Sequence, residues 1–314
     1  MKTFLKHKLN GVILILFLFG ISSCQNKDKT KKNSGIVTKE VEVQPKKKLS
    51  SQFKEYWYAG NAEITSYNLE MARYGETREG KSVLIFVTEP FLEDKQVKAD
   101  RPNPSNIPVL KLNSTKKFLT GIYPYSIMTS TFYPVHDNQH AMKVSTSVQE
   151  WCGHVYSQLN NREEFEIHSY SYFESEADQD FLLEKTVLEN ELWTKLRINP
   201  SDLPLGDFKA IPSFEYLRLG HKEFKSYDAI GSLTVNKGVS TYKITYPEHE
   251  RTLAINFSSD FPHTIESWTD TYKSGFGSNA KMMSTKATKI KRLKTPYWEQ
   301  NKNEHLFLRD SLGI

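Results

Sequence analysis

The sequence predicts a mostly β fold with some α structure (α+β): a large curled antiparallel sheet or half-barrel with one central helix at about residues 178–197. Three observations support this fold class. Apolar and polar residues alternate with a period of two along much of the chain, one stretch has helical spacing instead, and that stretch lies between two runs of strands. A long sheet curled around one helix is an economical packing, because the helix covers the apolar face of the sheet.

Several strands are expected before the helix. Residues 62–74 and 82–88 read as two strands joined near Glu79-Gly80, where a glycine permits the positive φ of a tight turn. Further strands are expected at residues 142–148 and 165–173, which alternate apolar or small residues with polar ones. The proline-rich stretch 100–108 is expected to be a long surface loop.

The predicted helix has apolar residues near one face, at spacings typical of an amphipathic helix: Phe181, Leu188, Leu192 and Leu196. Acidic residues at its start and basic residues at its end suit the helix dipole. The dipeptide Asn199-Pro200 is expected to stop it.

Strands resume after the helix. Residues 241–246 and 252–258 alternate cleanly and read as a hairpin, and residues 264–272 and 281–293 continue the pattern. A short second helix is expected within residues 296–314.

The N-terminus resembles the lipobox of bacterial lipoproteins. Three early lysines precede the apolar run VILILFLF, which is too short to cross a bilayer, and Ile21-Ser22-Ser23 leads directly to Cys24. The resemblance implies that residues 1–23 are a cleaved signal peptide and that Cys24 carries acyl chains, such as palmitate, which anchor the protein to a membrane. Gln25 follows where an aspartate would favour the inner membrane, so the expected location is the outer membrane of the cell envelope.

Residues 24–48 are expected to be the lipidated cysteine and a disordered charged tether. Residues 25–48 hold eight lysines and three acidic residues, and they contain few apolar residues. The whole chain has a formal net charge of +5, but without signal and tether the β-rich domain at residues 49–314 has about −3. The basicity therefore argues for a membrane surface, and no nucleic-acid partner is predicted.

A cysteine-nucleophile site is one candidate chemistry. Lipidation of Cys24 would leave Cys152 as the single free thiol, and Glu150 and His154 lie two residues to either side of it. On a regular strand, side chains two positions apart are too distant for a hydrogen bond, unless Gly153 introduces a bulge. The ordinary alternative is a buried, unreactive cysteine beside a packed tryptophan.

Metal and cofactor chemistry has little support in the sequence. His136 and His140 could contribute two metal ligands from a polar loop, with His154 or His168 as a third, but the sequence favours an ordinary solvated loop. The chain has no P-loop, no dinucleotide fingerprint and no G-x-S-x-G elbow, so no cofactor is predicted. Most acidic residues of the early strands, Glu63 among them, are expected on polar strand faces.

Aromatic residues provide the more informative signal. A concave sheet lined with aromatic, serine and threonine side chains could hold an amphipathic ligand or lipid, with Trp151, Tyr170, Tyr172 and Trp268 as the candidate contacts. The alternative is an ordinary β core with tyrosines at its rims, because aromatic residues favour strands in any case.

Residues 192–212 and the hairpins that follow them are similar to a family of uncharacterised exported bacterial proteins. The shared pattern is a helix ending in an arginine, here Arg197, then a Leu-x-x-Gly-Asp turn at Leu203, a proline, and hairpins. It covers about a third of the chain. The resemblance implies a half-barrel of the lipoprotein-carrier (LolA-like) kind.

These observations favour an envelope lipoprotein, anchored by its lipid, whose half-barrel binds a hydrophobic or amphipathic ligand or an envelope protein without catalysis. One alternative is a hydrolytic enzyme that uses Cys152 and His154. The other is a structural lipoprotein that acts through protein interactions.

Overall fold

The computed structural model describes residues 48–136 and 139–314. The predicted signal peptide, the proposed lipidation site Cys24 and almost all of the predicted tether lie outside the described residues.

Alternating burial defines the strands, as the sequence predicts. In the strand Val239–Tyr246, the side chains of Tyr242, Ile244 and Tyr246 are completely buried, while the residues between them are not. The next strand, Arg251–Ser258, alternates in the same way throughout its length. This alternation places one face of the sheet in the core and leaves the other partly accessible.

The strands form one sixteen-stranded sheet. From the middle to one edge it contains β1 (Ala62–Arg73), β2 (Glu76–Leu92), β4 (Ile107–Thr120), β5 (Tyr123–Pro134), β6 (Lys143–Glu150), β7 (Gly153–Asn161), β8 (Phe165–Ser171) and β9 (Gln179–Leu183). From β1 to the other edge it contains β16 (Lys281–Thr295), β15 (Ile265–Ser274), β14 (Arg251–Ser258), β13 (Val239–Tyr246), β12 (Tyr227–Thr234), β11 (Gly206–Ile211) and β10 (Val187–Leu188). The short β3 (Val97–Lys98) pairs with β2 outside this order.

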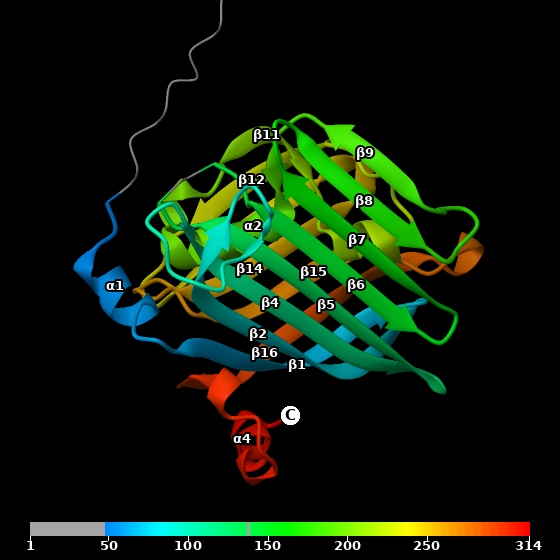
Figure 1. The fold of residues 1–314 in the computed structure, drawn as a ribbon. Helices are drawn as coiled ribbons and strands as arrows, with labels where there is room; N and C mark the ends of the chain where they lie inside the picture. Colours follow the sequence, from blue (N-terminus) through cyan, green and yellow to red (C-terminus); the bar gives the residue numbers. More distant parts are fainter. Residues whose placement is uncertain (1–47, 137–138) are drawn as a thin grey trace, which may run out of the picture. The chain divides into compact units, whose positions relative to one another are not determined.

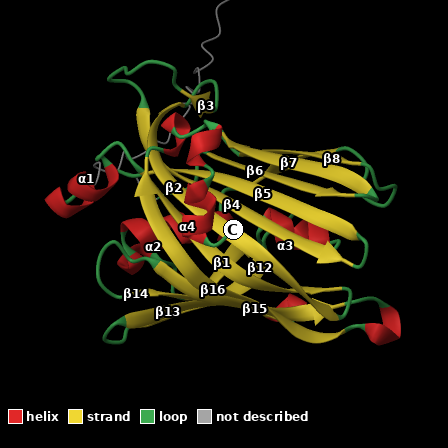
Figure 2. Ribbon diagram, turned by 90° about the horizontal axis from the view of Figure 1, so that it is seen from below, coloured by secondary structure: helices red, strands yellow, loops and turns green. Residues whose placement is uncertain are grey.

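The sheet is open and strongly curled, with β9 and β10 at its two edges. Figure 1 shows the strands from β4 to β9 as one wall in front of the strands from β11 to β15, and Figure 2 shows both walls meeting at β1, β2 and β16. All neighbouring strands pair antiparallel except β10 and β11, which are parallel. The predicted mostly β class with one large curled sheet is confirmed.

Few helices accompany the sheet. The α-helices are α1 (Ser51–Trp57), α2 (Glu189–Ile198), α3 (Phe214–Leu219) and α4 (Phe307–Leu312). Short 3-10 turns occur at η1 (Pro200–Asp202), η2 (Pro247–His249), η3 (Gly277–Asn279), η4 (Tyr297–Glu299) and η5 (Asn303–His305). Helices α2 and α3 lie on the concave side of the sheet, whereas α4 packs on its convex side (Figure 2).

The predicted helix at 178–197 is wrong in its first half. Residues 179–183 form the edge strand β9, which pairs with β8, and the helix begins only at Glu189. Phe181 and Leu183 are partly buried while Leu182 between them is 66% exposed, which is strand alternation rather than a helical stripe. The sequence misleads here because Phe181, Leu182 and Leu183 are consecutive apolar residues, which occupy both faces of a strand. Such a short apolar run fits the helical period and the strand period equally well.

The predicted turn at Glu79-Gly80 is also wrong. The β1–β2 turn lies at Tyr74-Gly75, where both residues have positive φ, and Gly80 is inside β2. A side chain at Gly80 would place its Cβ 2.3 Å from the carbonyl oxygen of Lys117 on β4. This glycine therefore permits close strand approach, not a turn.

The main core fills the concave side of the sheet, between both walls and helices α2 and α3. A separate apolar cluster lies on the convex side, where Leu312 of α4 packs against Ile64 and Val87. None of the helices within the described residues is long and apolar enough to span a membrane.

Candidate functional site

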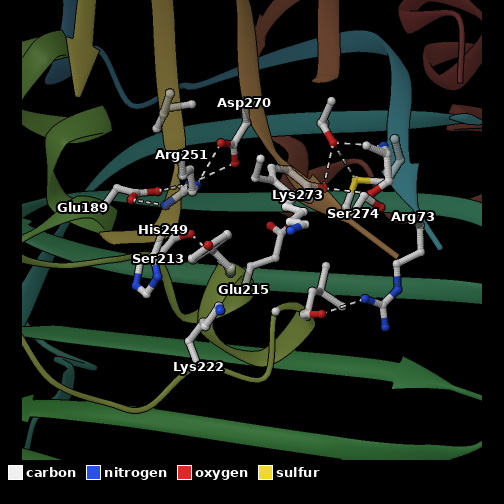
Figure 3. Close-up of a pocket in the computed structure, with 18 of the residues that line it drawn as sticks. Arg73, Glu189, Ser213, Glu215, Lys222, His249, Arg251, Asp270, Lys273 and Ser274 are labelled. Atoms are coloured by element: carbon white, nitrogen blue, oxygen red, sulfur yellow. Dashed lines mark hydrogen bonds and ion pairs between the residues drawn. The ribbon is translucent and has the colours of Figure 1, made fainter. Parts of the chain in front are cut away.

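A cavity of about 420 Å³ lies on the concave side, between the sheet and helices α2 and α3 (Figure 3). It is found at the end of the sheet that carries the β1–β2, β13–β14 and β15–β16 turns. Six tyrosine, tryptophan and phenylalanine residues contribute to its lining: Tyr74, Trp193, Tyr216, Trp268, Tyr272 and Phe276. Trp193 and Trp268 meet edge to face with ring centroids 5.3 Å apart.

A buried ion cluster forms one side of the cavity. Arg251 of β14 makes two hydrogen bonds with Glu189 at the start of α2, at 2.6 and 2.7 Å, and two with Asp270 of β15, at 2.8 and 2.9 Å. The guanidinium carbon lies 4.0 Å from the ring centroid of Tyr216. Figure 3 shows Arg251 between the two carboxylates.

The two carboxylates have opposite pKa shifts because one guanidinium serves both. Burial raises the pKa of Asp270 and Glu189 adds to the rise, and the attraction of Arg251 does not overcome it. Burial also opposes ionisation of Glu189, but the charge and hydrogen bonds of Arg251 lower the pKa of Glu189 overall. The cluster therefore holds a firmly ionised Glu189 and an Asp270 that takes up a proton more readily than an ordinary aspartate.

A second ion pair joins the wall to α3. Lys116 of β4 reaches Glu215 of α3 with nitrogen–oxygen distances of 2.8 and 2.9 Å, and both residues line the cavity. This bond connects α3 to the wall opposite the Arg251 cluster. Both α2 and α3 are therefore tied to the sheet by charge as well as by packing.

Arg73, at the end of β1, differs from these cations because it has no acidic partner. It is only 7% exposed, and no carboxylate among the described residues lies within ion-pair distance of it. One Nη donates to the carbonyl oxygen of Leu219 at 2.7 Å, and the other donates to the hydroxyls of Tyr74 and Tyr125 at 3.1 and 3.2 Å. Its Nε is buried without a hydrogen-bond partner in the described structure. The guanidinium carbon also lies 4.2 and 5.4 Å from the ring centroids of Tyr74 and Tyr125. The cavity thus contains a buried positive charge that neutral oxygens and aromatic rings solvate, without an anion among the described residues.

His249, in the β13–β14 turn, lies between two tyrosines at the edge of the cavity. Its ring centroid is 4.3 Å from that of Tyr227 and 5.5 Å from that of Tyr216. Burial lowers the pKa of His249, and the nearby charge of Lys222 lowers it further. At neutral pH this imidazole is uncharged and behaves as part of the aromatic lining.

The residues of the predicted cysteine site do not line this cavity; they lie in and beside the tight β6–β7 turn. Cys152 is exposed, and its backbone N–H donates to the Glu150 carboxylate at 3.3 Å. A hydrogen bond to Glu150 and the charge of that carboxylate raise the pKa of the Cys152 thiol. His154 pairs with Gln149 across the hairpin, and no hydrogen bond joins it to Cys152. The alternative of a buried cysteine beside a packed tryptophan is wrong, because Cys152 is exposed and Trp151 is 68% exposed.

The candidate metal ligands do not converge among the described residues. His140 places Nδ1 3.1 Å from Glu191 of α2, and His168 places Nδ1 2.5 Å from Asp180 of β9. Within residues 48–136 and 139–314, no group of three histidine, cysteine or acidic side chains could hold a metal ion.

The four predicted aromatic contacts separate into two groups. Trp268 is buried and lines the cavity. Trp151, Tyr170 and Tyr172 lie at or near the β6–β7 and β8–β9 turns and are 68%, 53% and 77% exposed. The structure therefore brings only Trp268 to the cavity.

The sequence argument missed the cavity's charged residues, although a usable signal was present. Arg251 is expected on the same strand face as the buried Leu253, and Asp270 on the same face as Trp268 and Tyr272. Arg73 is likewise expected on the same strand face as Met71. A charge in phase with an apolar face indicates a buried, paired or functional group, because an unpaired charge there is costly.

Comparison with protein-family models, with curated proteins and with solved structures found no match to this chain.

Proposed function

We propose that this protein is a lipid-anchored envelope protein that binds an amphipathic ligand in the concave cavity without catalysis. The observation that carries the proposal is the cavity itself, in which aromatic walls stand beside the buried charge of Arg73, which has no acidic partner among the described residues. A volume of about 420 Å³ lies in the range of small-molecule sites.

The cavity chemistry defines the class of ligand. Tyr216, Tyr272 and the paired tryptophans offer apolar and aromatic contact, which suits a hydrocarbon or ring system. A carboxylate or phosphate on the ligand would supply the counter-charge that Arg73 lacks. The proposed ligand is therefore a small amphiphile with one anionic group.

The finer architecture belongs to the same proposal. The two walls with α2 between them support a half-barrel of the lipoprotein-carrier kind, in which α2 is the central helix. The lipobox-like sequence at Cys24 supports the membrane anchor, and Gln25 supports an outer-membrane location.

Native mass spectrometry of the full chain, extracted from its host's envelope in a mild non-ionic detergent, tests this function. We expect a reproducible additional mass of small-lipid size, beyond that of the anchor, which organic extraction removes. A bare protein mass under conditions that preserve other lipid complexes would count against ligand binding.

An Arg73→Met variant locates the ligand. Removing the unpaired cation should lower ligand occupancy about tenfold, because a hydrogen bond to a charged group contributes about 1.5–3 kcal/mol. Lys237→Met, which removes an exposed charge in the β12–β13 turn, is the matched control. Equal occupancy in both variants would place the ligand elsewhere.

Exposed side chains on three successive turns favour a second candidate, a protein-interaction role. Ile122 in the β4–β5 turn is 82% exposed, and Trp151 and Tyr172 in the next two turns on this side of the sheet are 68% and 77% exposed. Apolar side chains gathered at one end of a sheet are typical of interaction surfaces. If this role is correct, mild crosslinking in the host should capture a stoichiometric protein partner, and a Trp151→Ala, Tyr172→Ala double variant should lose it.

A further inference from the structure

A groove of about 960 Å³ lies on the convex side of the sheet. Its floor is the outer face of β1, β2 and β16, with Ile64, Val83, Ile85 and Leu293, and α4 contributes Leu308 and Leu312. Figures 1 and 2 show that α4 lies against this convex side, where β1, β2 and β16 meet. The C-terminal segment 296–314 thus forms a cover over an apolar strip.

The floor can accept only a ligand that needs no hydrogen bonds from it. Its strands lie in the middle of the sheet, so their backbone N–H and carbonyl groups pair with neighbouring strands. An added peptide strand would find no free edge there, and its own polar groups would be left unsatisfied against aliphatic side chains. A hydrocarbon chain has no such requirement.

One rim of the groove is basic. Lys81 of β2 and Lys117 of β4 are direct cross-strand partners and are both exposed, and α4 adds Arg309. Like charges directly opposite each other destabilise a strand pair unless something compensates them. Lys81 donates to the Asn68 side chain at 2.8 Å, but none of the three cations has a salt bridge within the described structure. Glu79 is the one acidic residue among the groove's described lining residues.

We propose that this groove is a second lipid site, distinct from the concave cavity, and that it binds a single-chain anionic amphiphile of the fatty-acid class. The acyl chain lies on the aliphatic floor beneath the C-terminal segment. The carboxylate lies at the rim, where it supplies the negative charge that Lys81 and Lys117 lack. The inference does not depend on a ligand in the concave cavity.

The test uses the full chain in neutral phosphatidylcholine vesicles with two photoreactive probes. One is palmitic acid with a diazirine on its chain, and the other is the corresponding palmityl alcohol. Peptide mapping by mass spectrometry should place the acid's label in residues 79–85 and 297–314. The acid should label these segments more strongly than the alcohol does.

A Lys81→Glu, Lys117→Glu variant should reduce labelling by the acid about tenfold and leave labelling by the alcohol unchanged. Lys237→Glu, Lys243→Glu makes the same charge change at exposed positions on β13 and the preceding turn, and it should leave both unchanged. All four lysines are exposed, so circular dichroism should show folded protein in each case.

Two outcomes would overturn the proposal. Equal labelling by acid and alcohol would assign the groove to a neutral chain, and label confined to peptides around Trp193 and Trp268 would leave the groove without a lipid. Arg73→Met separates the two sites, because it should alter binding in the concave cavity and leave groove labelling intact.

Discussion

At the residue scale, buried charges are a prominent feature of this protein. Glu63 of β1 was expected on a polar strand face, yet it is fully buried and makes two hydrogen bonds with Arg197 at the end of α2, at 2.7 and 2.8 Å. Tyr56 donates a further hydrogen bond to Glu63. Arg197 also lies against the rings of Trp57 and Phe86, 5.0 and 4.6 Å from their centroids. One ion pair therefore joins α1, α2 and the sheet.

Removing the cation of this pair should be strongly destabilising. Arg197→Met leaves the Glu63 carboxylate buried without its partner, which typically costs about 3–5 kcal/mol of unfolding free energy. Urea unfolding followed by circular dichroism measures the change. Asp228→Asn breaks the exposed Lys209–Asp228 pair and should change stability by no more than about 1 kcal/mol. Similar effects from both variants would contradict the importance assigned to burial.

The same pair predicts loss of stability in acid. Burial would raise the pKa of Glu63, but Arg197 and the Tyr56 hydrogen bond lower it overall. A carboxyl with a lowered pKa in the fold contributes stability above its unfolded pKa, about 4.3 for glutamate, and that contribution is lost as the pH falls through the folded pKa. Unfolding free energy should therefore fall below about pH 4.3. A Glu63→Gln, Arg197→Met variant should show a shallower fall between pH 5 and 3 (about the range set by these pKa values), and an unchanged slope would refute the assignment.

At the element scale, α2 is a buried helix whose charges are matched to the surrounding sheet. Its first residue, Glu189, pairs with Arg251 of β14, and Arg197 in its last turn pairs with Glu63 of β1. Between them, Glu191 accepts a hydrogen bond at 2.7 Å from the backbone N–H of Ala141, which follows β5 in the opposite wall. These contacts connect α2 to three separate parts of the sheet.

The β6–β7 hairpin gives a prediction at this scale. Cys152 is exposed in its turn, so a maleimide should label the thiol in native protein without denaturant. Because Glu150 raises the pKa of the thiol, labelling at pH 8 should be slow, and Glu150→Gln should accelerate it a few-fold. Stopped-flow labelling measures both rates. Faster labelling of the unmodified protein than of a free cysteine peptide would instead support the alternative of an activated nucleophile.

At the scale of the whole molecule, the sheet has two apolar surfaces of unequal size. The large concave cluster does not include the C-terminal segment, whereas the small convex cluster depends on it through Leu312 and Ile314. The hydroxyl of Ser66 on β1 also donates to the carbonyl oxygen of Leu312. The segment therefore acts as a cover rather than as part of the main core.

Deletion of residues 296–314 should leave the fold intact and cause the protein to self-associate. The uncovered strip with Ile64, Val83, Ile85 and Leu293 would form a contiguous apolar patch on the convex side. Far-UV circular dichroism should change little, while a hydrophobic dye should bind and size-exclusion chromatography should show self-association. Loss of sheet structure on deletion would show that the segment belongs to the folding core.

The sequence by itself determined the mostly β class, the single curled sheet and most strands, because period-two alternation is a local property of consecutive side chains. It placed Tyr242, Ile244 and Tyr246 on the buried face correctly. It also provided the predictions about Cys24 and the tether, which lie outside the described residues. It failed where local signals were ambiguous, at the edge strand β9 and at Gly80, whose roles depend on strands distant in sequence.

Only the tertiary structure decided which charges are buried together. Arg251, Glu189 and Asp270 come from three elements, and Arg73 shares the cavity with them although almost 180 residues separate it from Arg251. The alternation pattern marks each of the strand residues as inward-facing, but it does not specify which partner each one meets. Pairing depends on the register and curl of the whole sheet, and the same curl separates the exposed Trp151 and Tyr172 from the buried Trp268.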